Sequence, residues 1–118
     1  DLVILKYAIR VNGITEICFT KLDVLDGMKS IKVCTAYKTK SGEILDEYPL
    51  DLDVYSECEP IYEELPGWDD DISQITSYKE LPETAKKYCE FVSAQTGVKI
   101  KLISVGTRRR QTIHLLEV

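Results

Sequence analysis

The central feature of the sequence is Ile17-Cys18-Phe19-Thr20-Lys21-Leu22-Asp23-Val24-Leu25-Asp26-Gly27, a short apolar segment that changes abruptly into a polar loop. Residues 16–20 predict a strand in a sheet, and residues 24–28 predict a short helical turn. Ligands of α/β proteins bind beyond the carboxyl ends of strands, so Lys21 and Asp23 form a candidate base-recognition site there. The Lys-x-Asp pattern alone has little specificity, because about one match is expected by chance in a chain this rich in both residues.

The composition indicates a globular domain without a nucleic-acid or membrane partner. A length of 118 residues and a hydrophobic content of 44% are typical of one such domain. The net charge of −5 argues against a dedicated binder of nucleic acid or anionic membranes, and no stretch approaches a membrane span. Four widely spaced cysteines without a C-x-x-C pair lead us to expect reduced core thiols in a cytoplasmic protein: Cys18, Cys34, Cys58 and Cys89.

The N-terminal segment predicts a helix that is apolar on nearly every side. Residues 2–11 are mostly apolar, Asp1 is suited to cap the start of the helix, and Asn12-Gly13 is suited to end it. A small domain has little surface with which to cover such a helix. We therefore expect residues 1–118 to be the C-terminal part of a longer chain, in which upstream residues cover the remaining face.

The next segment predicts a β-hairpin over residues 30–48. Apolar and polar side chains alternate over residues 31–38, which is typical of a half-buried strand. Residues 40–43 have the composition of a turn, and Ile44 and Leu45 begin a return strand.

The segment after the hairpin predicts an extended strand at a sheet edge. Residues 51–58 show no clear pattern, whereas residues 59–65 have strand composition. Pro60 has no N–H to donate to a ladder, which favours an edge position. The residues Pro66-Gly67-Trp68 are then expected to turn the chain, with Trp68 packed in the core.

The last third predicts one long helix between two strands. The helix covers residues 82–96, with proline in its first turn and Gly97 just past its end. Its helically spaced apolar residues form a core stripe rather than a cofactor site: Leu81, Ala85, Tyr88, Cys89 and Val92. Residues 98–103 alternate as a strand that ends at Ser104-Val105-Gly106, a second polar edge, and residues 111–116 predict a closing strand.

The sequence contains no motif that carries chemistry of its own. It has no G-x-x-x-x-G-K-S/T loop, no G-x-G-x-x-G and no nucleophile elbow. The adjacent acids Asp69, Asp70 and Asp71 are more often solvated than bound to a cation. His114, the only histidine, has no catalytic partner in any motif and is expected to be structural. We expect this chain to supply specificity, with no catalytic or metal-binding residue.

Several motifs in the same order resemble the C-terminal region of the adenylosuccinate synthase family. The resemblance runs essentially from end to end and rests on residues 7–13 (YAIRVNG), 20–27 (TKLDVLDG), 62–68 (YEELPGW), 81–83 (LPE) and 104–106 (SVG). It implies an α/β fold, namely the C-terminal part of a larger mixed-sheet, P-loop-like GTP-binding enzyme with a β-hairpin and one long helix.

The resemblance also implies a reaction and its substrates. In this family GTP phosphorylates the 6-oxygen of IMP, and the amino group of L-aspartate displaces the phosphate with the assistance of Mg²⁺, giving adenylosuccinate in AMP biosynthesis. The phosphate loop, the catalytic residues and the magnesium ligands are implied to lie upstream of residue 1. The full enzyme is implied to be a cytoplasmic homodimer, and the isolated chain is expected to be inactive.

By resemblance, two segments of this chain recognise the guanine base of GTP. The first is the triplet Lys21, Leu22 and Asp23, and the second comprises Ser104, Val105 and Gly106. The chemistry agrees, because guanine presents two neighbouring N–H donors to which one carboxylate can bind bidentately. The Lys21 stem can lie along the purine, and the Ser104 hydroxyl or the N–H groups around Gly106 can donate to the 6-oxygen. The alternative role for Asp23 is a cap on the turn that follows it.

The loop after Gly106 departs from the family pattern. The family often has proline after Ser-x-Gly and an acidic residue after the next arginine, whereas this chain has Thr107-Arg108-Arg109-Arg110-Gln111. The three arginines are expected to form a solvated turn rather than a phosphate contact. Two functions from other classes stay open, namely a non-catalytic guanine-nucleotide-binding regulatory module and an interaction domain with an acidic surface.

Overall fold

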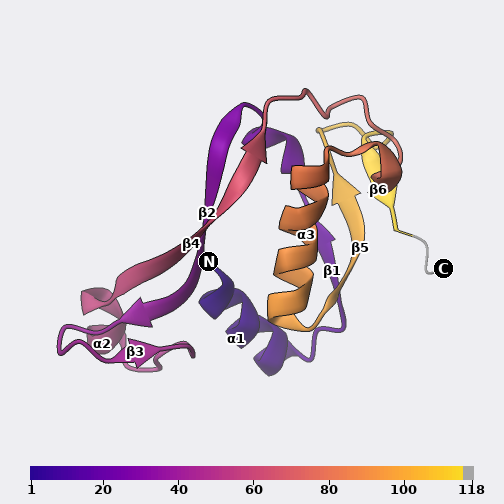
Figure 1. The fold of residues 1–118 in the computed structure, drawn as a ribbon. Coiled ribbons are helices and arrows are strands. Elements are labelled where there is room, and N and C mark those ends of the chain that lie inside the picture. The colour runs from indigo at the N-terminus through magenta and orange to yellow at the C-terminus, as the bar shows by residue number, and fades with distance from the viewer. Residues whose placement is uncertain (116–118) are drawn as a thin grey trace. The chain divides into compact units, whose positions relative to one another are not determined.

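The computed structural model describes residues 1–115, which form two compact units (Figure 1). The first unit comprises Asp1–Ile14 and Lys32–Glu64, and the second comprises Thr15–Ile31 and the described residues from Leu65 onward. The predicted mixed α/β fold is confirmed: within the described residues, helices accompany two three-stranded sheets, ordered β1-β5-β6 and β3-β2-β4.

Helix α1 (Leu2–Asn12) opens the first unit and has the predicted caps. The Asp1 Oδ1 atom accepts hydrogen bonds from the N–H groups of Val3 at 2.9 Å and Ile4 at 3.1 Å. Gly13 ends the helix in the left-handed conformation, with φ 61°. Burial is confined to the first turn, at Leu2 and Val3, whereas Ile4 is 39% exposed. Within residues 1–115 one face of the helix is thus left uncovered, as expected for a chain that lacks the surface to cover it, and its cover by upstream residues stays a prediction.

The predicted hairpin is present in a shorter form. Strand β2 (Met28–Lys38) pairs antiparallel with β3 (Ile44–Leu45), with Tyr37 opposite Leu45. Cys34 lies on the polar face of the predicted alternation but is buried with Val3 and Tyr37 in a small core. The stretch without a sequence pattern contains helix α2 (Leu52–Glu57), whose first turn is capped by Asp51.

The predicted turn at residues 66–68 is wrong, because these residues belong to strand β4 (Glu59–Trp68). The strand continues through Pro66 and Gly67, and Trp68 is its last residue. Proline is tolerated because β4 is an edge strand of its sheet. A Cβ atom on Gly67 would lie 1.8 Å from the carbonyl oxygen of Met28, so the missing side chain permits close main-chain approach instead of a turn.

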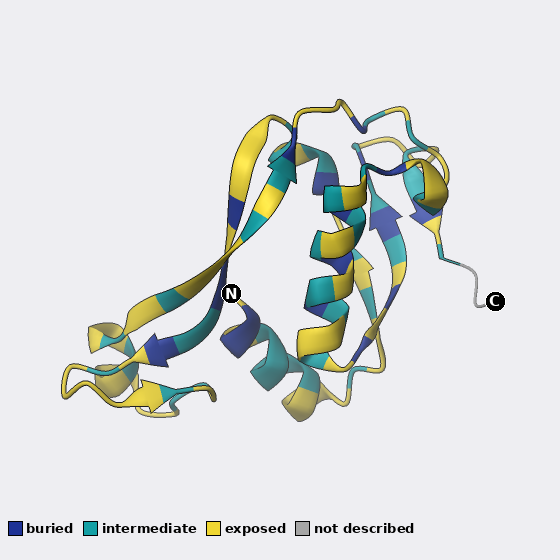
Figure 2. Ribbon diagram, viewed as in Figure 1, coloured by how far each residue is buried: buried dark blue, intermediate teal, exposed yellow. Residues whose placement is uncertain are grey.

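The second unit combines helix α3 (Glu83–Thr96) with strands β1 (Glu16–Phe19), β5 (Lys99–Ser104) and β6 (Thr112–His114). Strand β5 pairs parallel with β1 and antiparallel with β6. The predicted core stripe of α3 is confirmed, since its buried residues are Ala85, Cys89 and Val92 (Figure 2). The helical turn predicted over residues 24–28 is observed two residues earlier, as the 3-10 helix η1 (Leu22–Leu25), because strand β2 already begins at Met28. The predicted closing strand is observed over Thr112–His114, and its end at residue 116 lies outside the described residues.

The four cysteines are free thiols, but they do not all lie in the core. Cys34 and Cys89 are buried as predicted, Cys58 is partly buried and Cys18 is exposed on β1. Burial raises the pKa of the Cys89 thiol to about 12, so it stays protonated at neutral pH. None of the helices in the described chain has the length and apolar character needed to cross a membrane.

Candidate functional site

The two predicted recognition segments meet at one edge of the β1-β5-β6 sheet. Because β1 and β5 run parallel and Phe19 lies opposite Ile103, the loops that follow the two strands leave the sheet side by side (Figure 1). The main-chain N–H of Lys21 donates to the Ser104 Oγ atom at 2.8 Å. This bond joins residues 83 positions apart in the sequence and makes the two segments one site.

Lys21 has an unusual backbone conformation at this edge. Its φ of 56° lies in the left-handed region, and among residues 1–115 it is the one residue other than glycine with a positive φ. This conformation costs roughly 1–2 kcal/mol for an L-residue. The hydrogen bond to Ser104 and the burial of Leu22, which is 1% exposed, hold it in place. Such strained residues are concentrated at ligand-binding sites, and Lys21 is also exposed.

Asp23 has an unsatisfied carboxylate oxygen. Its Oδ1 atom is buried and has no hydrogen-bond partner within the described chain. The alternative role of Asp23 as a turn cap is wrong, because η1 begins after Lys21 and has no side-chain cap. A buried acceptor without a partner costs about 1–3 kcal/mol and is rare in folded proteins. The Asp23 carboxylate can therefore receive N–H donors from a bound molecule.

In the second segment, residues 104–106, one residue packs in the core and the other two carry hydrogen-bond donors. Val105 is fully buried, and its N–H already donates to the carbonyl of Gln111 at 2.8 Å. Ser104 accepts the bond from Lys21 through its oxygen, so its hydroxyl proton remains available. Within residues 1–115 the N–H of Gly106 has no acceptor. Among the donors predicted around Gly106, the Val105 N–H is therefore excluded, and the Ser104 hydroxyl and the Gly106 amide remain available.

Asp26 supports the site, although the sequence pattern does not distinguish it from other loop acids. Its Oδ1 atom accepts the indole N–H of Trp68 at 2.7 Å, and its Oδ2 atom accepts the N–H of Ile72 at 3.2 Å. Trp68 is 4% exposed, which confirms its predicted role in packing. The one local signal for Asp26 is its place before Gly27 at the end of the loop, and its partners lie more than 40 positions away.

We expect Asp26→Ala to lower the free energy of unfolding of the intact protein by about 3 kcal/mol, because the donors of two buried residues, Trp68 and Ile72, lose a charged acceptor. Asp26→Asn keeps one acceptor oxygen and should fall between Ala and the native residue. Urea denaturation measures the change, with exposed Asp69→Ala as the matched control at about 0.5 kcal/mol or less. Equal losses for Asp26→Ala and Asp69→Ala would contradict the supporting role.

The charged loops of the second unit show no metal site. Asp69, Asp70 and Asp71 are exposed, as is His114 on β6. The described residues contain no group of His, Cys, Asp and Glu side chains that could hold a metal ion. The arginines at positions 108–110 are also exposed, in agreement with the predicted solvated turn.

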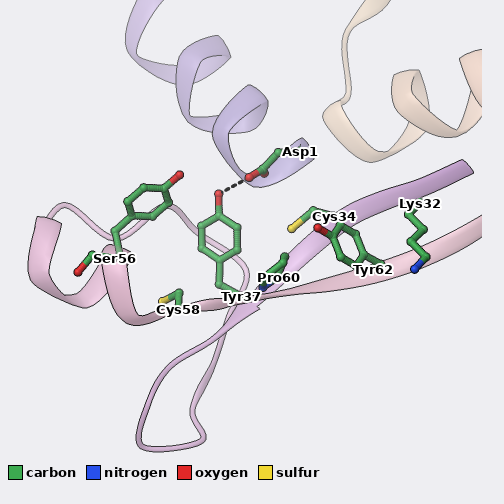
Figure 3. Close-up of a pocket in the computed structure, with 9 residues that line it drawn as sticks. Asp1, Lys32, Cys34, Tyr37, Ser56, Cys58, Pro60 and Tyr62 are labelled. Carbon is green, nitrogen blue, oxygen red and sulfur yellow. Dashed lines mark hydrogen bonds between the residues drawn. The ribbon is translucent and has the colours of Figure 1, made fainter. Parts of the chain in front are cut away.

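A cavity of about 430 Å³ lies in the first unit (Figure 3). Its lining includes Tyr37, whose hydroxyl donates to the Asp1 Oδ2 atom at 2.5 Å. Burial raises the pKa of Tyr37 to about 12, so the phenol keeps this proton at neutral pH. The Lys32 ammonium lies 5.8 Å from the centre of the Tyr62 ring, at which it can make a cation–π contact. None of the predicted recognition residues lines this cavity.

Comparison with known proteins agrees with the resemblance in the motifs. A family model described as adenylosuccinate synthetase matches residues 1–113. The chain belongs to the adenylosuccinate synthetase family. An adenylosuccinate synthetase from Desulforamulus reducens is 51% identical over 115 residues, which cover 98% of this chain and 27% of that protein. One from Clostridioides difficile is 51% identical over 113 residues, 96% of this chain and 26% of that protein.

The fold of the chain is also that of the family. A solved structure of fully ligated adenylosuccinate synthetase from Plasmodium falciparum superimposes with a TM-score of 0.93 at 39% sequence identity. The superposition covers 98% of this chain and 28% of that protein. The chain therefore spans about a quarter of the length of its relatives.

Proposed function

We propose that the chain is the guanine-recognising part of an adenylosuccinate synthase, the GTP-dependent ligase that joins IMP and L-aspartate to form adenylosuccinate. One observation carries the proposal. The bond between the Lys21 N–H and the Ser104 Oγ atom brings both predicted segments to one sheet edge, next to the unsatisfied Oδ1 atom of Asp23.

The Asp23 carboxylate fits guanine better than it fits adenine. Guanine carries a ring N–H and an amino group side by side, which match the two acceptor oxygens of an ionised carboxylate. Adenine has an acceptor in place of the ring N–H, so a carboxylate would face a lone pair. A charge-assisted pair contributes about 1.5–3 kcal/mol, and an unpaired buried carboxylate costs a comparable amount. These terms support discrimination on the order of 10² against adenine nucleotides.

The remaining residues of the site complement the rest of the base. The aliphatic stem of Lys21 lies along the purine in this proposal, and its exposed position leaves room for a ring. The Ser104 hydroxyl and the Gly106 N–H donate to the 6-oxygen of guanine. Leu22 and Val105 are buried and anchor the two segments in the core.

The proposal assigns the chemistry to the part of the enzyme outside this chain. GTP, IMP and L-aspartate are the proposed substrates, and by resemblance to the family Mg²⁺ and the catalytic groups are held by residues outside this chain. The four free thiols agree with the reducing environment of the cytoplasm, where we place a homodimeric enzyme.

The proposal is tested on the full-length enzyme that contains this chain. Adenylosuccinate formation from IMP and L-aspartate is measured with GTP or ATP as the phosphate donor. We expect kcat/KM to be about 10² or more higher with GTP, and equal values would overturn the guanine assignment. The isolated chain is assayed in parallel. Tight GTP binding by this chain without adenylosuccinate formation would favour a regulatory module instead.

A further inference from the structure

We propose that Gln111 is a positioning residue that holds the Ser104–Gly106 segment in the conformation that binds the guanine base. The inference rests on the proposed function, since it concerns the same site. Gln111 touches none of the proposed hydrogen-bonding atoms of the base. It acts through the loop that joins β5 to β6, which begins at Val105 and ends at Gln111.

Gln111 uses its side chain and its main chain to close this loop. Its Oε1 atom accepts the N–H of Arg108 at 3.0 Å, and its Nε2 atom donates to the carbonyl of Ser73 at 2.9 Å. Its carbonyl accepts the N–H of Val105 at 2.8 Å, and its own N–H donates to the carbonyl of Arg108 at 2.9 Å. The amide is thus tied to the loop and to a second segment 38 positions away in the sequence.

Gly106 makes room for the Gln111 amide. A Cβ atom at position 106 would lie 2.3 Å from both the Cδ and the Oε1 atoms of Gln111. A glutamine amide can usually rotate away from such a contact, but here two hydrogen bonds hold it. The φ of Gly106 is not positive, so the need for glycine is steric rather than conformational. Gly106 and Gln111 are therefore a matched pair.

The contact between Gly106 and Gln111 controls the position of the hydrogen-bond donors proposed to bind the base. Val105 lies between Ser104 and Gly106, and its N–H donates to the main-chain carbonyl of Gln111. Displacement of the Gln111 side-chain amide would shift the Gly106 N–H and the Ser104 hydroxyl, which are the two proposed donors to the 6-oxygen of guanine. Inosine triphosphate has this oxygen but lacks the 2-amino group that Asp23 binds. Changes at Gln111 should therefore affect both nucleotides equally, whereas changes at Asp23 should affect GTP more.

The test uses single and double variants of the full-length enzyme. We expect Gln111→Ala to raise the KM for GTP and for inosine triphosphate by the same factor, about tenfold, with the KM for IMP unchanged. Gln111→Met, which keeps most of the volume without the amide, should do the same. Gln95→Ala, at an exposed glutamine of α3, is the control that leaves all three KM values unchanged.

The double variant separates positioning from a general folding defect. Gly106→Ala alone should raise the KM for GTP about tenfold, but it should add little in the Gln111→Ala background, where its clash is absent. Additive effects, or an equal rise in the KM for IMP, would overturn the inference. If Asp23→Asn, in which an amide replaces the carboxylate, shifts the preference of the enzyme from GTP to xanthosine triphosphate while Gln111→Ala leaves the KM for GTP unchanged, only this inference fails. If Asp23→Asn produces no exchange, the proposed function fails.

Discussion

Asp23→Asn in the full-length enzyme is expected to lower kcat/KM for GTP by about 10² or more and to restore much of it with xanthosine triphosphate. Asparagine presents one acceptor and one donor where guanine requires two acceptors, so an N–H group of the base would face an N–H group of the side chain. Xanthine carries a carbonyl where guanine has its amino group, and the asparagine amide complements it. The buried position of the Oδ1 atom of Asp23 makes the mismatch costly, because water cannot replace the lost partner.

The measurement compares both triphosphates on both proteins at fixed IMP and L-aspartate. Asp23→Ala is the matched control, since it removes the carboxylate without offering xanthine a donor. It should lose activity with GTP and gain none with xanthosine triphosphate. An equal loss with both nucleotides in Asp23→Asn would assign Asp23 to folding and would remove the basis for guanine recognition at this edge.

Gly67→Ala is expected to destabilise the protein by about 3 kcal/mol or more, the upper range for an overpacked position. The new Cβ atom would lie 1.8 Å from the carbonyl oxygen of Met28 and 2.8 Å from its carbonyl carbon. Both atoms belong to the main chain, so no side-chain rotation can relieve the contact. The two chain segments would have to separate, which would also strain the hydrogen bond between the Gly27 N–H and the Trp68 carbonyl at 2.9 Å.

Gly42→Ala provides the control for the conformational cost of replacing a glycine. Gly42 has a φ of 92° and no atom within 4 Å of the position of a Cβ, so the substitution adds backbone strain without a clash. We expect it to cost about 1–2 kcal/mol. Thermal and urea denaturation of the full-length enzyme measure both variants. Gly67→Ala with no greater loss than Gly42→Ala would show that the main chain relaxes around the added methyl group.

Local features of the structure were predictable because their causes lie within a few residues. Asp1 caps α1 through atoms two and three positions away, and Gly13 and Gly97 end their helices in the left-handed conformation that glycine adopts most easily. Alternating side chains identified the strand that became β2, and helical spacing identified the buried face of α3. The motif at Lys21 and Asp23 also marked the candidate site, since a polar loop after an apolar strand is a local pattern.

The exact end of β4 depended on tertiary structure. The residues Pro66-Gly67 predicted a turn, because both residue types favour turns and proline cannot donate to the hydrogen-bond ladder of a sheet. The edge position of β4 and the close approach to Met28 turned the same two residues into part of a strand. The burial of Cys34 was expected of a core thiol, but the alternation of β2 put it on the polar face, and only the packing of the first unit shows it in a core with Val3 and Tyr37.

The sequence by itself determined the family and the main helices and strands, and it pointed to two candidate recognition segments, because these depend on residue types and short spacings. Only the tertiary structure decided how the segments combine. The Lys21–Ser104 bond spans 83 positions, the Asp26–Trp68 bond spans 42 and the Gln111–Ser73 bond spans 38. Each bond forms because parallel strand pairing and loop packing bring distant residues together. No local pattern could reveal that Asp26 and Gln111 hold the site while Asp23 retains an unsatisfied oxygen.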